Sequence, residues 1–143
     1  SGTLNVPSIV GFGKAAKIAK EEIEKKSYLR IEKLRRKLET NLVDSSSKLN
    51  GLGAIRLPHV SSISFPGFDG KRLLKLLNKF VAVSSGSACS SASLETSHVL
   101  KAMGIDSETA QATIRFSLGK NTTEQEIDFT ILKVREILTI LKK

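Results

Sequence analysis

The sequence predicts an α/β domain in which a small sheet of about three strands is covered on one side by helices. Long segments with apolar residues at every third or fourth position, typical of helices, alternate with short segments rich in Val, Ile and Phe, typical of strands. The strand connections are short, which suits a small sheet packed under helices. A chain of 143 residues is long enough for one domain with its own core.

Residues 5–41 are predicted to be helical, in two pieces. Asn5 is the expected N-cap, and Pro7 is tolerated in the first turn because its missing N–H would have no intrahelical partner there. A bend near Lys26 or Ser27 is expected to separate the pieces. The apolar stripes are Phe12, Ala16, Ala19 and Ile23 in the first piece and Ile31, Leu34, Leu38 and Leu42 in the second.

A loop, a strand and a helix are predicted next. Serine and glycine dominate residues 44–53, which indicates a loop. Val60, Ile63 and Phe65 indicate a short strand, which the following Pro-Gly pair ends. Asp69 is the expected cap of a helix with four leucines in its core-facing part.

The apolar residues 81–83 are predicted to form a short buried strand, and it leads into a run of small residues. That run, residues 84–93, has little to pack and little propensity for regular structure, so it is expected to be an exposed, mobile loop. A helix should follow over residues 95–103, closed by Gly104 in the left-handed conformation.

The last two elements are a strand and a long helix. Residues 111–118 alternate, so Ala112, Ile114 and Phe116 should share one face while Arg115 and Ser117 share the other. Thr123 and Glu126 have the spacing of a capping box. The apolar stripe of the final helix is Ile127, Ile131, Val134, Leu138 and Leu141.

Composition narrows the class of protein. There is no run of 18 apolar residues and no signal-peptide pattern at the start. One cysteine cannot form an internal disulfide, and with two histidines it is a poor basis for a metal site. Much of the net charge of +9 lies between Lys14 and Lys37, which could form a basic nucleic-acid-binding module. A solvated helix face is the favoured interpretation, because no aromatic or glycine-rich segment accompanies these charges.

Cys89 is the first candidate for chemistry. A free cysteine is most often a small buried hydrophobe. Residues 84–93 offer no large apolar neighbour to bury it, and an exposed thiol is a liability unless it is used. Because the loop itself supplies no cation to favour the thiolate, activation would come from His98, another domain or the substrate.

Arg115 is the second candidate. A guanidinium within an apolar strand is costly unless it binds a carboxylate or phosphate, or unless the strand lies at an edge with Arg115 in solvent. His98, on the helix that follows the cysteine, is more often a surface histidine than a catalytic base.

Three ordered motifs resemble the NifS/IscS-type cysteine desulfurases of the class-V aminotransferase-like enzymes. They are Ser84-Ser85-Gly86-Ser87-Ala88-Cys89 with Ser93-Leu94-Glu95 and Val99-Leu100-Lys101-Ala102-Met103-Gly104, then Ile114-Arg115-Phe116-Ser117-Leu118-Gly119, and at the start Ser1-Gly2-Thr3 with Ile9-Val10-Gly11-Phe12-Gly13. The similarity runs in register over nearly the whole chain. Ser87 and Ala88 stand where the short-loop class has two histidines, so the sequence resembles the long, mobile-loop class.

The resemblance implies the mostly antiparallel sheet of the C-terminal domain of a fold-type-I pyridoxal-phosphate (PLP) enzyme. Residues 1–26 would be a connecting helix that leaves an absent PLP domain, and residues 27–143 the small domain, with the cysteine loop at 84–94. L-cysteine would be converted to L-alanine, with its sulfur captured as a persulfide on Cys89. Arg115 would hold the substrate carboxylate, and Thr3 would reach the PLP phosphate of the neighbouring subunit in a homodimer.

The sequence also departs from the resemblance. The family's cofactor-binding lysine, its stacking histidine and its aspartate belong to a preceding domain, so the chain is expected to be a fragment that binds no PLP tightly and is inactive alone. The partners implied are L-cysteine and a sulfur acceptor or iron–sulfur scaffold, and the location is the cytoplasm or an organelle of bacterial origin. A selenocysteine lyase is the alternative within the fold, and the basic nucleic-acid binder is the alternative outside it.

Overall fold

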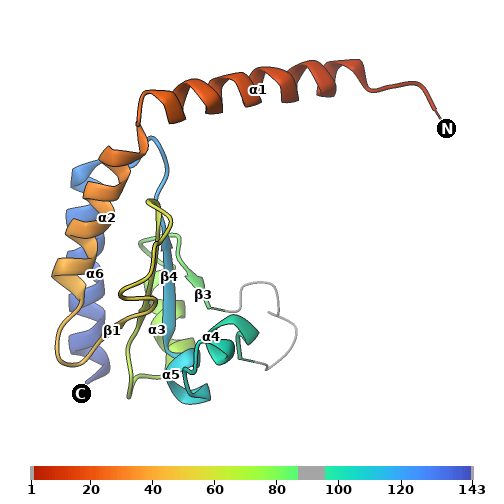
Figure 1. Ribbon diagram of the computed structural model, residues 1–143. Helices are drawn as coiled ribbons and strands as arrows, with labels where there is room; N and C mark the ends of the chain where they lie inside the picture. The colour runs from red at the N-terminus through yellow and green to blue at the C-terminus, as the bar shows by residue number, and fades with distance from the viewer. Residues whose placement is uncertain (1, 87–95, 143) are drawn as a thin grey trace.

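The computed structural model describes residues 2–86 and 96–142, and this part of the chain contains six helices and a four-stranded sheet (Figure 1). In chain order the elements are α1 (Val6–Glu24), α2 (Tyr28–Leu42), β1 (Lys48–Leu49), β2 (Val60–Ser64), α3 (Gly70–Leu77), β3 (Ser84–Ser85), α4 (His98–Ala102), α5 (Ser107–Gln111), β4 (Thr113–Ser117) and α6 (Glu124–Leu141). The strands are ordered β1-β2-β4-β3 and every neighbouring pair is antiparallel. The predicted α/β class with a small antiparallel sheet is confirmed, with one strand more than expected.

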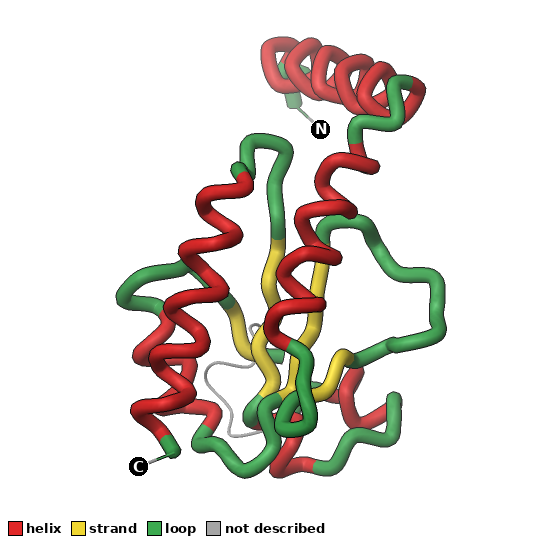
Figure 2. Tube along the Cα trace, turned by 90° about the vertical axis from the view of Figure 1, so that its left-hand side faces the viewer, coloured by secondary structure: helices red, strands yellow, loops and turns green. Residues whose placement is uncertain are grey.

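The two faces of the sheet differ in chemistry. On one face Ile63, Ile114 and Phe116 are buried under α2, α3 and α6, where they join the apolar stripes of these helices. Figure 2 shows α2 and α6 side by side in front of the strands. The opposite face is polar and includes Arg115 and Ser117, which are exposed. The alternation therefore predicted the faces of β4 correctly, but the strand is shorter than the predicted 111–118, because Gln111 ends α5 and Ala112 is the C-cap of that helix.

The predicted bend between the first two helices is confirmed at residues 25–27. Lys26 there has a φ of 53°, in the left-handed region. Asn5 accepts a hydrogen bond from the backbone N–H of Ser8, as expected of an N-cap. The apolar stripe of α1 is present but contains no buried residue, and α1 projects away from the sheet (Figure 1). The stripe of α2, by contrast, forms part of the core.

A charged cluster is buried between α2 and β2. The carboxylate of Glu39 accepts bidentate hydrogen bonds from Arg56. It also accepts bonds to both oxygens from one nitrogen, Nη1, of Arg35, and a further one of 2.8 Å from the Ser61 hydroxyl. Glu39 is only 7% exposed. Burial raises the pKa of a carboxyl group, but the hydrogen bonds from Arg56, Ser61 and Arg35 outweigh it, so the pKa of Glu39 lies below its ordinary value.

The strand predicted at residues 81–83 is wrong. The N–H groups of Phe80 and Val81 bond to the Leu77 carbonyl, and the N–H of Val83 bonds to the Asn78 side chain. These N–H groups therefore bond to the C-terminal end of α3 and are not available for pairing with a strand. The strand begins immediately afterwards, at Ser84 and Ser85, so the first two residues of the predicted loop are β3.

Two further short elements were assigned to loops or left without regular structure. β1 is only two residues long and lies within the predicted loop at 44–53. α5 begins after Asp106, whose side chain caps it by accepting from the N–H of Thr109. The helix before it starts at His98, behind the Ser97 cap, and Gly104 closes it with a φ of 77° as predicted.

The remaining helix ends agree with the sequence. Asp69 accepts hydrogen bonds from the N–H groups of Lys71 and Arg72 at the start of α3. Thr123 and Glu126 form the complete capping box of α6. Gly70 lies so close to the chain entering β4 that a Cβ built on it would lie 1.9 Å from the Gln111 carbonyl oxygen. This approach fixes α3 against the central strand.

Candidate functional site

Arg115 occupies the middle of β4, the strand between β2 and β3. Its cross-strand partners are Ser62 on β2 and Ser84 on β3. Directly opposite residues in an antiparallel pair project from the same face, so the three side chains form a row across the polar face of the sheet. Both neighbours are small, and the guanidinium is exposed. The sequence left two possibilities for Arg115, an anionic partner or exposure to solvent on an edge strand. Arg115 is exposed, but its strand is central and not at an edge.

The guanidinium of Arg115 has no hydrogen bond or ion pair with the residues that the structure describes. Five of the seven arginines do have such partners: Arg35, Arg36 and Arg56 bind carboxylates, and Arg30 and Arg135 bind backbone carbonyls. The other exception, Arg72, lies on the exposed side of α3. Arg115 is thus available to a planar anion, for which its fork of N–H donors is suited.

A network of short polar side chains lies beside Arg115 on the same face. The Asn50 amide nitrogen donates to the Ser62 hydroxyl at 3.0 Å and to the Ser64 hydroxyl at 2.9 Å. The Ser64 hydroxyl lies 2.7 Å from that of Thr113, which donates to the Thr109 carbonyl. Ser64 and Thr113 are fully buried, whereas Ser62, nearer to Arg115, is half-buried. Sequence reasoning missed this network because Asn50 was assigned to a loop and the serines to a strand pattern.

Cys89 lies outside the described residues, but the chain on both sides of it is placed. On the N-terminal side the chain runs through Ser84, opposite Arg115, and Ser85 to Gly86. On the C-terminal side it resumes before Ser97, which is buried and caps α4. A Cβ on Gly86 would lie 2.6 Å from the Leu100 side chain, so the flanks are packed against each other. The segment that contains Cys89 therefore begins and ends next to the strand beside Arg115.

His98 and Thr3 are both exposed. His98 is the first residue of α4, three residues beyond the end of the undescribed segment. Thr3 lies in the extended segment before α1, and the structure does not bring it near Arg115, because α1 carries the N-terminus away from the sheet (Figures 1 and 2). Of the predicted site residues with described positions, none contacts another.

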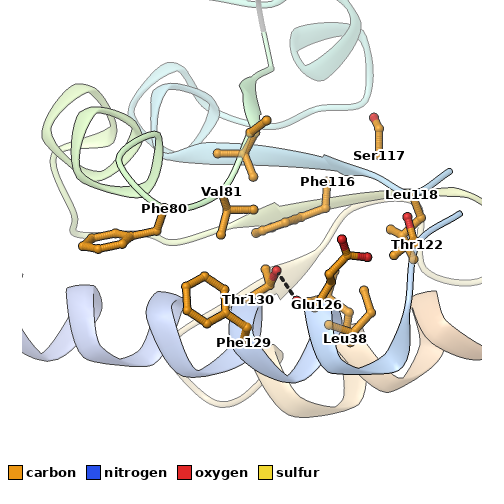
Figure 3. Close-up of a pocket in the computed structure, with 13 residues that line it drawn as sticks. Leu38, Phe80, Val81, Phe116, Ser117, Leu118, Thr122, Glu126, Phe129 and Thr130 are labelled. Atoms are coloured by element: carbon orange, nitrogen blue, oxygen red, sulfur yellow. Dashed lines mark hydrogen bonds between the residues drawn. The ribbon is translucent and has the colours of Figure 1, made fainter.

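A separate cavity of about 350 Å³ lies on the helical side of the sheet, between β4, residues 80–83 and α6. Figure 3 shows Phe80, Phe116 and Phe129 around it, with Ser117 pointing to the other side of β4. Its Glu126 side chain is occupied by the capping box. Arg115, His98 and Thr3, the predicted site residues with described positions, do not line this cavity, so it is distinct from the polar face that carries Arg115.

The basic stretch from Lys14 to Lys37 is partly neutralised within the chain. Four of its ten basic residues pair with carboxylates: Lys20, Arg35, Arg36 and Lys37. Lys37 reaches both Asp128 and Glu124 on α6, and these bonds raise its pKa. The surface of α2 is therefore not continuously basic. The nucleic-acid-binding alternative has no support.

Comparison with known families decides the relationship. The family model for "Aminotransferase class-V" matches residues 1–129. The chain belongs to this family. Class-V aminotransferases and the cysteine desulfurases among them imply pyridoxal phosphate in the full-length enzyme.

The relatives of this class-V chain are cysteine desulfurases. It is 48% identical over 147 residues to "Cysteine desulfurase IscS" of Anaeromyxobacter sp. (strain Fw109-5), covering 100% of this chain and 35% of that protein. It is 46% identical over 144 residues to "Cysteine desulfurase, mitochondrial" of Arthroderma benhamiae, covering 100% of this chain and 28% of that protein. The chain thus spans about a third of the length of the curated relatives that it matches.

Solved structures agree in fold. A "NIFS-LIKE PROTEIN" superposes with a TM-score of 0.83 at 40% identity, over 99% of this chain and 35% of that one. The NifS-like protein from Rickettsia africae also has a TM-score of 0.83, at 33% identity, over 97% of this chain and 36% of that one. The resemblance seen in the three sequence motifs is confirmed.

Three hollows formed by the described residues can be compared with the needs of a pyridoxal-phosphate site. Such a site needs a lysine amine for the cofactor's aldehyde and several donors for its phosphate. Neither the 350 Å³ cavity nor the hollow beside Glu39 has a lysine in its wall. A third hollow, at the bend between α1 and α2, contains Lys120, whose amine lies 3.5 Å from Glu22.

Among the described helices, none is long and apolar enough to span a membrane.

Proposed function

We propose that this chain is the C-terminal part of a pyridoxal-phosphate cysteine desulfurase. The supporting observation is the position of Arg115. Its free guanidinium lies on the polar face of the sheet, directly opposite the strand from which the Cys89 segment starts. A guanidinium suited to a carboxylate and the start of the thiol-bearing segment thereby lie on neighbouring strands of one domain, which suits a reaction between a thiol and an amino acid.

In the proposed reaction Cys89 accepts sulfur from L-cysteine. A sulfur–sulfur bond forms between Cys89 and the substrate sulfur, and the carbon–sulfur bond of the substrate breaks. The substrate carbon keeps the electron pair and gains a proton, so that L-alanine leaves and Cys89 carries a persulfide. The reaction needs no external oxidant, since L-cysteine and one thiol become L-alanine and one persulfide.

Arg115 would orient the substrate by binding its carboxylate through two parallel hydrogen bonds. An α-amino acid has one carboxylate, and a bidentate clamp fixes both its position and its rotation. Ser62 and Ser84 leave room for a ligand beside the guanidinium, since neither side chain extends far from the sheet. The proposed substrate site therefore lies on the polar face and not in the apolar cavity.

The domain arrangement follows from the same proposal. Residues 1–26 would connect to a PLP-binding domain, and the exposed apolar stripe of α1 would pack against that part of the full-length protein. Thr3 would reach the cofactor phosphate of a neighbouring subunit, in a homodimer. On this proposal the cofactor-binding lysine belongs to that PLP domain, so the chain on its own should neither bind PLP tightly nor turn over cysteine.

The persulfide would pass to an acceptor protein for iron–sulfur clusters or for thiolated nucleosides. A relative named as mitochondrial and others from bacteria support a location in the cytoplasm or in an organelle of bacterial origin. A selenocysteine lyase is the alternative within the same fold. It would not need Cys89, so the same experiment separates the two.

The test uses the full-length enzyme that contains this chain, loaded with pyridoxal phosphate. After incubation with L-cysteine, mass spectrometry should find one added sulfur on the peptide that contains Cys89. Cys89→Ser should abolish both the added mass and sulfide release. Full sulfide release by the serine variant would refute the assignment of Cys89.

A further inference from the structure

Ser62 holds a hydroxyl beside Arg115 in a fixed orientation. The Asn50 amide donates to the Ser62 oxygen at 3.0 Å, while the Asn50 N–H bonds to the Ser62 carbonyl at 2.9 Å. Asn50 thus binds both the backbone and the side chain of Ser62. Among the described residues the Ser62 hydroxyl donates to no acceptor, so its own proton remains available.

The sheet register brings this proton donor to Arg115. Ser62 and Arg115 are directly opposite, and so are Ser64 and Thr113 two residues further along the strands. Pairs two residues apart in an antiparallel ladder are of the same type. The hydroxyls of Ser64 and Thr113 lie 2.7 Å apart, which shows that side chains in this type of pair meet on this face.

We propose that Ser62 is a second donor to the carboxylate of the substrate amino acid, beside the guanidinium of Arg115. The proposal rests on the proposed function and extends it to a residue on another strand. A carboxylate has four lone-pair sites, and two parallel bonds from Arg115 leave the others for a neutral donor. Asn50 makes the hydroxyl ready for this role because it occupies the Ser62 oxygen as an acceptor and so directs the proton outward.

Ser62 differs from Ser64 and Ser117, two other serines of this face, in its partners or its place along the strands. Ser64 shares the Asn50 amide but is fully buried, and its hydroxyl already bonds to Asn50 and Thr113. Ser117 is exposed on the same face but lies opposite Val60, two residues along β4 from Arg115. Ser117 is therefore the matched control.

The experiment compares Ser62→Ala, Ser62→Thr and Ser117→Ala in the full-length, PLP-loaded enzyme. Loss of one hydrogen bond to a charged group should raise the KM for L-cysteine about tenfold in Ser62→Ala and leave kcat within about twofold. Ser62→Thr keeps the hydroxyl and should restore the KM, and Ser117→Ala should not change it. The Kd of L-alanine, measured by calorimetry, should rise in parallel with the KM.

The carboxylate itself is tested with cysteamine, which is cysteine without that group. Ser62→Ala should weaken inhibition by L-alanine about tenfold and leave inhibition by cysteamine unchanged. Equal weakening of both inhibitors, or an unchanged KM, would overturn the proposal. Arg115→Ala in the same assays separates the two levels. If Arg115→Ala weakens inhibition by L-alanine and Ser62→Ala does not, only the role of Ser62 is wrong. If neither variant weakens this inhibition, the carboxylate site itself is wrong.

Discussion

Arg115 shows how the position of a residue in a sheet can leave a guanidinium available for a ligand. Arginines in this chain normally bind carboxylates or backbone carbonyls, and Arg115 has neither among the described residues. Its position between two serines keeps the guanidinium accessible from the face that the helices leave uncovered. The same side chain at a sheet edge would be a solubility feature and no more.

Replacing Arg115 should therefore affect substrate binding more than folding. In the full-length enzyme, Arg115→Ala should raise the KM for L-cysteine by about 10²-fold, because a bidentate charged contact is lost. Arg115→Lys should recover only part of this loss, since an ammonium cannot form the two parallel bonds. Steady-state kinetics measures the effect, and an unchanged KM in Arg115→Ala would remove the residue from the site.

Glu39 is the carboxylate that neutralises the charges of both Arg35 and Arg56. Glu39→Gln would leave Arg35 and Arg56 without their common counter-charge, and breaking a buried ion pair in this way costs about 3–5 kcal/mol. Because Arg56 is partly exposed, we expect the lower end of that range in urea unfolding of this chain. Glu24→Gln, which breaks only the exposed pair with Lys20, should cost less than about 0.5 kcal/mol. Equal losses in the two variants would contradict this account.

At the scale of elements, the contact between α3 and the entry to β4 depends on a missing side chain. Gly70→Ala would place a Cβ against the Gln111 backbone, which cannot move without shifting the central strand. We expect a loss of about 2–4 kcal/mol in the free energy of unfolding. Gly13→Ala, in a helix position with open space around it, should cause no loss. Denaturation of the two variants in parallel checks the prediction, which fails if Gly70→Ala is as stable as the parent.

Sequence patterns predicted the elements that have long periodicity or specific caps. The stripe of α2, the Asp69 cap and the Thr123–Glu126 box each identify an element by several residues at once. β3 could not be found this way, because two serines have no periodicity and pair only through their backbone. The strand predicted at residues 81–83 was wrong because composition does not reveal backbone hydrogen bonds. The N–H of Val81 donates to the Leu77 carbonyl, and that of Val83 donates to the Asn78 side chain.

The candidate site was predictable only in part for a related reason. Arg115 stood out as a charge within an apolar strand, and the family motifs identified Cys89. The Asn50–Ser62 contact joins a loop to a strand across twelve residues, and only the register of the sheet reveals that it lies beside Arg115. Pairings between strands distant in sequence are set by the whole fold and carry no local signal.

At the scale of the whole molecule, stability should fall in acid. The pKa values of Glu39, Asp44, Asp106 and Glu126 are lowered, mainly by hydrogen bonds that their carboxylates accept. A group with a lowered folded pKa contributes stability above its unfolded pKa, about 4, and loses it as the pH falls through the folded value. The free energy of unfolding should therefore be level near pH 7 and decline below about pH 5. A stability that rises between pH 5 and pH 3 would contradict the sign.

The molecule should also tolerate loss of its first helix. α1 has no buried residue, and its ion pair with the body, Glu22 to Lys120, is exposed. Removal of residues 1–24 should leave the free energy of unfolding within about 1 kcal/mol of the parent, by urea denaturation followed by circular dichroism. A larger loss would mean that α1 packs on the domain in solution.

The strand order β1-β2-β4-β3 has a consequence for synthesis on the ribosome. β4 is the last strand to be made, yet it is the central one, with β2 on one side and β3 on the other. Until Ser117 has left the exit tunnel, β2 lacks one neighbour and β3 has none. Cys89, the proposed sulfur acceptor, emerges during this interval, so a nascent chain exposes this thiol before its sheet is complete. Slow translation after residue 89 would prolong that stage and with it the exposure of unpaired strands to aggregation.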